Sequence, residues 1–128
     1  MSTDLEGLQV AILATDGVEQ VELVEPLKAL KAAGADVRIV SLKTGTIQAM
    51  HQDVNPGDKI PVDHDLSVDA DIFDALVLPG GTTNPDKLRM SDDAIEFVQH
   101  FVDNDKPIAA ICHGPWICLL YTSPSPRD

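Results

Sequence analysis

The chain has 128 residues, of which 44% are apolar, and 21 aspartates and glutamates against 9 lysines and arginines give a formal net charge of −12. This length and composition suit one domain with a hydrophobic core. An acidic surface repels nucleic-acid phosphates and anionic lipids, no apolar run approaches the roughly 20 residues of a membrane-spanning helix, and the N-terminus lacks the pattern of a secretory signal. We therefore expect a cytoplasmic single domain without a nucleic-acid or membrane partner.

Four short apolar runs predict the strands of a sheet: residues 8–14, 37–40, 75–78 and 108–111. Their nearly continuous apolar content is typical of parallel strands that are covered on both faces. Residues 44–71 are different, because they hold glycines, prolines and several aspartates without a helical stripe. This segment predicts a hairpin and loops at the edge of the sheet, with residues 46–50 and 59–63 as short strands.

Two helices are predicted between these strands. The first has an apolar stripe of Leu23, Val24, Leu27 and Leu30. Pro26 is expected to open or kink that helix, and Gly34 is expected to end it with a left-handed cap. The second has Ser91 as its N-cap and a stripe of Ala94, Ile95, Val98, Phe101 and Val102,. This alternation predicts a flavodoxin-like, doubly wound α/β fold, with a mainly parallel sheet and helices on both faces.

The last predicted strand leads directly into Cys112, His113, Gly114 and Pro115. A strand of small residues, a sharp turn and a helix start are typical of a nucleophile elbow. Such a turn presents a thiol at the carboxyl edge of the sheet, where open α/β folds bind ligands. A helix N-terminus there favours the thiolate. The alternative is an inert, buried cysteine that ends a strand.

Three motifs occur in order along the chain. They are ATDGVEQVEL at residues 14–23, LPGG at 78–81 followed by NPDKLR at 84–89, and AICHGP at 110–115. Together they resemble the ThiJ/PfpI family, within the class I glutamine-amidotransferase-like superfamily, and most closely the PfpI-type stress proteins. The resemblance covers residues 8–117.

The resemblance implies a role for each matching residue. Cys112 matches the elbow nucleophile, and His113 matches the histidine that works with it. Glu22 matches a glutamate whose carboxyl lies against the cysteine sulfur. A protonated carboxyl there would donate a hydrogen bond to the thiolate, whereas an ionised one would repel it.

The resemblance also implies a binding site and an assembly. Asp86 falls where relatives have an acidic residue that reaches the histidine of a neighbouring subunit, which implies a homo-oligomer. The N–H groups of Gly80 and Gly81, with the amide of His113, are candidate donors to an oxyanion.

Each candidate has an ordinary structural alternative. Glu22 could be a solvated helix residue, Asp86 could support a turn, and Gly80 with Gly81 could form only a tight turn. Three other histidines are expected at the surface: His51, His64 and His100. Their spacing to nearby aspartates matches no zinc or calcium motif, and no GxGxxG or Walker sequence is present, so we expect no metal and no cofactor.

The implied function is a cysteine-dependent enzyme of stress defence. Members of the family are described as acting on reactive dicarbonyls, on glycated amino groups or on peptides, so the expected partners are small carbonyls, glycated proteins or peptides. One alternative is a non-enzymatic redox sensor or stress chaperone that uses the same cysteine, because an activated thiolate is also readily oxidised. Another is that the chain, as given, is an inactive fragment.

Residues 118–128, CLLYTSPSPRD, change from a helix start to a string of prolines and serines. They resemble the translation of a transposase library adapter. We therefore expect a partial domain at residues 1–117, incomplete at its C-terminus, followed by a non-native tail. The alternative is a natural proline-rich terminus.

The source DNA tests this expectation directly. We predict that codons 118–128 reproduce the adapter sequence and that sequencing across this junction gives a different native reading frame. Codons unlike the adapter would contradict the prediction.

Overall fold

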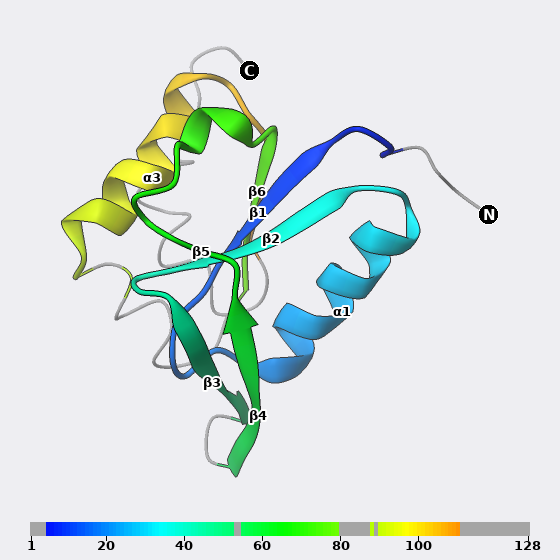
Figure 1. The fold of residues 1–128 in the computed structure, drawn as a ribbon, viewed down its shortest axis with the longest axis vertical. Helices are drawn as coiled ribbons and strands as arrows, with labels where there is room; N and C mark the ends of the chain where they lie inside the picture. The colour runs from blue at the N-terminus through cyan, green and yellow to red at the C-terminus, as the bar shows by residue number, and fades with distance from the viewer. Residues whose placement is uncertain (1–4, 53–54, 80–87, 89, 111–128) are drawn as a thin grey trace.

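The computed structural model describes residues 5–52, 55–79, 88 and 90–110. Within them, a five-stranded sheet has the order β5-β2-β1-β6-β7, and every neighbouring pair is parallel (Figure 1). Its strands are β1 (Gln9–Leu13), β2 (Asp36–Ser41), β5 (His64–Asp65), β6 (Ala75–Leu78) and β7 (Ile108–Ala110). The order β2-β1-β6-β7 is that of a flavodoxin-like sheet, to which β5 adds a two-residue edge. The predicted fold class is confirmed.

The four apolar runs form β1, β2, β6 and β7, and no predicted strand end differs from the observed one by more than one residue. Ile111, the last residue of the fourth run, lies outside the described residues. Successive side chains of a strand point to opposite faces, so each buried strand supplies two cores. In β1, Val10 and Ile12 belong to one apolar cluster, and Ala11 and Leu13 belong to the other.

Helix α1 (Gln20–Ala32) covers one face of the sheet together with the hairpin of β3 (Gly45–His51) and β4 (Asn55–Val62). The buried side chains of this face are Val10, Ile12, Ala14, Val18, Leu23, Ala35, Val37, Ile39, Ile47, Ala49 and Val77. The hairpin is a separate two-stranded sheet. The expected hairpin and its two strands are therefore confirmed. β5, in the same segment, is an edge strand of the main sheet as expected, whereas the hairpin itself packs over the α1 face. Ile47 and Ala49 pack over the α1 face because their apolar side chains need a cover there.

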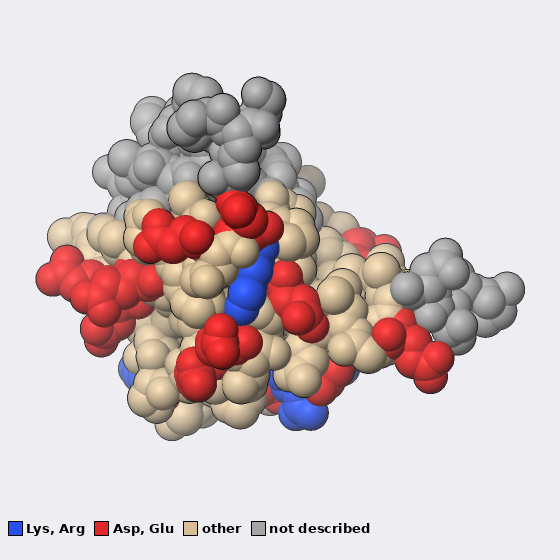
Figure 2. Space-filling model, turned by 90° about the horizontal axis from the view of Figure 1, so that it is seen from above, with Lys and Arg blue, Asp and Glu red and all other residues tan. Residues whose placement is uncertain are grey.

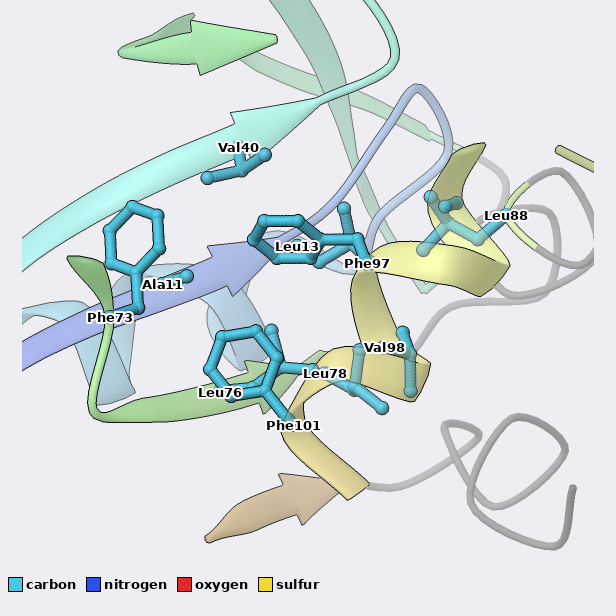
Figure 3. Close-up of a cluster of buried hydrophobic side chains, with 11 residues drawn as sticks. Ala11, Leu13, Val40, Phe73, Leu76, Leu78, Leu88, Phe97, Val98 and Phe101 are labelled. Atoms are coloured by element: carbon cyan, nitrogen blue, oxygen red, sulfur yellow. The ribbon is translucent and has the colours of Figure 1, made fainter. Parts of the chain in front are cut away.

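Helix α3 (Asp92–Asp103) and the short helix η1 (Ala70–Ile72) lie on the opposite face (Figure 1). Figure 3 shows the side chains of α3 directed at Leu13, Leu76 and Leu78 of the strands. Phe97 lies 5.3 Å from Phe101 and 6.1 Å from Phe73 between ring centroids, in tilted and edge-on arrangements. Such contacts stabilise a core beyond the area that they bury. Phe97 belongs to the buried face of α3, although the predicted apolar stripe of this helix did not include it.

Helix α1 begins six residues before Pro26, so the expectation that this proline opens the helix is wrong. Pro26 lies inside α1, where it cannot donate the usual hydrogen bond to the carbonyl of Glu22. Tertiary packing of the apolar stripe holds the helix in spite of it. The predicted end is confirmed: Gly34 has φ +98°, its N–H donates to Lys31 O at 3.0 Å, and Ala35 N–H donates to Leu30 O at 3.0 Å. These two bonds form a Schellman cap.

Carboxylates dominate the charged surface. Figure 2 shows acidic side chains spread across the visible face, with few lysines or arginines among them, in agreement with the net charge of −12. Among the described residues, no helix is both long enough and apolar enough to cross a membrane.

The N-cap of α3 gives a stability prediction. The Ser91 hydroxyl accepts from the N–H of Ala94 at 3.2 Å, as predicted for this residue. Ser91→Ala should lower the free energy of unfolding by about 1 kcal/mol, because an N-terminal N–H of α3 loses its acceptor. Urea unfolding followed by far-UV circular dichroism measures the change. Ser91→Asp should keep the stability, and Glu96→Ala, an exposed substitution on the same helix, should change little. An equal loss from Glu96→Ala would contradict the capping role.

Candidate active site at the carboxyl edge of the sheet

The three motif-bearing segments follow three adjacent strands. β6 pairs with β1 on one side and with β7 on the other, and all three run parallel. The register places Ile12 beside Val77, and Leu78 beside Ala110, so the strands end nearly level. The carboxyl ends of parallel strands share one edge, and ligands bind at that edge where the strand order reverses. Here the order reverses between β1 and β6.

The described residues contain one of the six candidate site residues, Glu22. The other candidates lie outside the described residues: Gly80, Gly81, Asp86, Cys112 and His113. The chain leaves β6 two residues before Gly80 and leaves β7 two residues before Cys112. β6 and β7 therefore end at the edge that also carries the loop from β1 to α1.

Glu22 lies in the first turn of α1 and is half-buried. Its N–H donates to Glu19 O at 3.1 Å, and its neighbour Leu23 is fully buried in the core under α1. Glu25, on the next turn, is exposed. Glu22 is thus less exposed to solvent than Glu25. Its position places a titratable group at the first helix turn after β1, beside the shared strand edge.

The loop that leads to Glu22 is bound to the β3–β4 hairpin. Gly17 N–H donates to Gln48 O at 2.9 Å, and Gln48 N–H donates to the Asp16 carboxylate at 2.8 Å. Met50 N–H donates to Val18 O at 2.8 Å. In Figure 1 the hairpin lies beside the beginning of α1. The loop therefore uses the free edge of β3 as its hydrogen-bonding partner.

Two side chains of the same segment extend this contact. The Glu19 carboxylate accepts from Gln52 N–H at 2.8 Å. The Gln20 amide donates to the Asp58 carboxylate at 3.1 Å and accepts from Asp58 N–H at 2.7 Å. The sequence analysis did not identify these residues, because partners 32 to 38 positions apart leave no periodic signal.

Hydrogen bonds from the hydroxyl and the N–H of Ser67 lower the pKa of Asp65 below its ordinary value. This carboxylate ends the edge strand β5, two strands away from β1. A carboxylate that accepts from the residue two positions later forms a local turn. Asp65 therefore shapes the turn toward η1 and takes no part in the candidate site.

The remaining histidines differ in exposure. His51 is exposed, as expected, whereas His64 and His100 are half-buried. The ring of His64 packs edge-on to Phe73 at 6.4 Å, and His100 Nε2 lies 3.1 Å from Lys106 Nζ. Aromatic packing and the lysine contact hold these two rings against the α3 layer. In the described part of the chain, no three histidine, cysteine or acidic side chains are grouped to hold a metal ion.

Residues 8–123 match the DJ-1/PfpI family. Among the curated relatives, the chain is 42% identical to "Putative cysteine protease YraA" of Bacillus subtilis over 87% of this chain and 63% of that protein. It is 39% identical to the deglycase TK1284 of Thermococcus kodakarensis, over 88% of this chain and 64% of that protein. The chain thus spans about 63% to 64% of the length of these relatives.

A solved structure supports the same assignment. Oxidized DJ-1 of Toxoplasma gondii superposes with a TM-score of 0.77 at 25% sequence identity, over 89% of this chain and 60% of that one. The family match covers more than half of the chain, and the parallel sheet has the order expected for the fold. The chain belongs to the DJ-1/PfpI family.

Proposed function

We propose that this chain carries the cysteine site of a PfpI-type enzyme that acts on reactive carbonyls or glycated amino groups. The observation that carries the proposal is the adjacency of β1, β6 and β7, whose carboxyl ends share one edge with the first turn of α1. Each of the three motifs follows one of these strands. The deglycase name of TK1284 supports the substrate class.

The proposed chemistry begins with the Cys112 thiolate. Its sulfur attacks a carbonyl carbon, and the electron pair of the C=O bond moves onto the oxygen. N–H groups of Gly80, Gly81 and His113 stabilise that oxyanion, because donors fixed before the reaction cost no reorganisation. The His113 imidazole moves the proton as general acid and base. Asp86 of a neighbouring subunit orients this imidazole in a homo-oligomer.

Glu22 has a separate proposed role. Two anions close together raise the pKa of one of them, so a carboxyl beside a thiolate holds its proton and donates it in a hydrogen bond. The proposal requires that the Cys112 thiolate lies close enough to Glu22 for this effect.

Peptide hydrolysis and redox sensing are the competing functions of the same cysteine. The name of YraA refers to a cysteine protease, and a further relative at 34% identity is named general stress protein 18 of Bacillus subtilis. A thiolate activated for attack on a carbonyl is also the form that peroxide oxidises. Turnover measurements separate these functions.

The first test replaces the nucleophile in the protein as encoded by its source DNA. Cys112→Ser should lower the turnover of methylglyoxal by at least about 100-fold, since a hydroxyl at neutral pH is a far weaker nucleophile than a thiolate. Glu25→Ala, an exposed substitution on α1, is the control and should keep the rate. Absence of turnover by the unmodified protein, together with stoichiometric oxidation of Cys112 by peroxide, would favour the sensor over the enzyme.

The second test measures the Cys112 thiol through the pH dependence of its alkylation by iodoacetamide, followed at this residue by peptide mass spectrometry. Loss of a donor to the thiolate disfavours the charged form, so Glu22→Ala should raise the pKa of Cys112 by about 1 to 2. Alkylation at neutral pH becomes slower. Glu25→Ala, one helix turn away and exposed, should leave the profile unchanged. A lower pKa of Cys112 in Glu22→Ala would mean that Glu22 is ionised and repels the thiolate.

A further inference from the structure

Every residue from Asp16 to Gln20 makes a hydrogen bond to the β3–β4 hairpin. The loop and the hairpin behave as neighbouring strands, since Glu19 forms a parallel bridge with Met50. The contact is also close along β4, where Gly57 leaves room for the amide oxygen of Gln20. The position of this loop is therefore set by the hairpin as well as by β1.

Gln48 is held at both of its backbone polar groups. Its N–H donates to the Asp16 carboxylate at 2.8 Å, and its carbonyl accepts from Gly17 N–H at 2.9 Å. Gly17 has φ +93°, a backbone conformation that L side chains rarely adopt,. This turn lets two successive residues, Asp16 and Gly17, form hydrogen bonds with Gln48 of β3. The neighbours of Gln48 along β3, Ile47 and Ala49, are buried, so β3 itself is fixed by the core.

The hydrogen bonds between the loop and the hairpin extend to the first turn of α1, which contains Glu22. Val18 is fully buried, and its carbonyl accepts from Met50 N–H at 2.8 Å. Glu19 is the N-cap residue of α1, its carboxylate is bound by Gln52 N–H, and its carbonyl accepts from the N–H of Glu22. The first turn of a helix lacks internal partners for its N–H groups, so its position depends on the residues that precede it. In this chain those residues are attached to the hairpin.

We infer that Asp16 is a positioning residue of the candidate site: by binding Gln48 N–H, its carboxylate fixes the first turn of α1 and with it the place of Glu22. The inference rests on the proposed function, in which Glu22 contacts the Cys112 sulfur. Asp16 is the position to test because its carboxylate makes the first contact between the loop and the hairpin after β1.

The experiment is a double-mutant cycle on the protein as encoded by its source DNA, with alkylation followed at Cys112 by peptide mass spectrometry. The pH profile of Cys112 alkylation by iodoacetamide is measured for Asp16→Ala with Glu22 present and with Glu22→Ala. With Glu22 present, Asp16→Ala should slow alkylation at neutral pH by about 3- to 10-fold, the effect of weakening one hydrogen bond to the thiolate. With Glu22→Ala, it should have no further effect, since the two residues act as a unit.

Two further variants separate positioning from general loosening and from charge. Asp16→Asn keeps an oxygen acceptor for Gln48 N–H and should restore the profile, although it removes the charge. Asp63→Ala removes a carboxylate that accepts from Ile39 N–H at 2.7 Å, a bond of the same kind between the hairpin end and β2. It should leave the profile unchanged. Should Asp16→Ala fail to fold, Asp16→Glu, which displaces the carboxylate by one methylene, takes its place with the same expectation.

The outcomes are distinct. An effect of Asp16→Ala that persists unchanged in Glu22→Ala overturns the inference, as does a failure of Asp16→Asn to restore the profile or an equal effect of Asp63→Ala. A Glu22→Ala profile identical to that of the unmodified protein overturns the proposed role of Glu22, and the inference with it. A shift in Glu22→Ala without any shift in Asp16→Ala overturns the inference alone.

Discussion

The burial of β1 on both faces is the constraint on which the rest of the structure depends. Val10, Ala11, Ile12 and Leu13 are at most 1% exposed, and they alternate between the two apolar clusters. A strand with no solvent-exposed face requires a covering layer on each side of the sheet. One layer is α1 with the hairpin, and the other is α3 with η1. The backbone of β1 also needs partners on both edges, and β2 and β6 supply them in parallel register,.

The same constraint creates a difficulty where β1 ends. Beyond Leu13 the chain leaves the sheet, and its polar backbone groups lose the regular partners that β2 and β6 provided. Ala14 N–H still donates to Val40 O at 3.0 Å, but each residue from Asp16 to Gln20 has a partner in the β3–β4 hairpin. The hairpin thus supplies hydrogen-bonding partners to the loop, as a neighbouring strand does to β1. A site at this edge depends on an element that is outside the main sheet.

The sequence predicts the layers and the strands of the hairpin, but not the contacts of the hairpin with the loop before α1, for a physical reason. Apolar runs and stripes record burial, which is local in sequence, so β1, β6 and the Ser91 cap of α3 were predictable. Pro26 suggested a helix boundary because its local preference is strong, yet packing of Leu23 into the core outweighs it. The contact of Asp16 with Gln48 spans 32 positions and depends on tertiary structure. The candidate site itself came from motif resemblance, and its placement at one edge followed from strand order.

Electrostatics links the two parts of the site. A carboxyl and a thiol that share one proton titrate as a pair, and their coupling falls off with the distance between them. The chain already carries a formal charge of −12, so a second local anion beside a thiolate is unfavourable unless the carboxyl keeps its proton,. In the proposed site, this coupling therefore depends on how near the first turn of α1 is held to the end of β7. A loop that is bound to a fixed β-hairpin holds that distance constant, whereas a loop in water would let it vary.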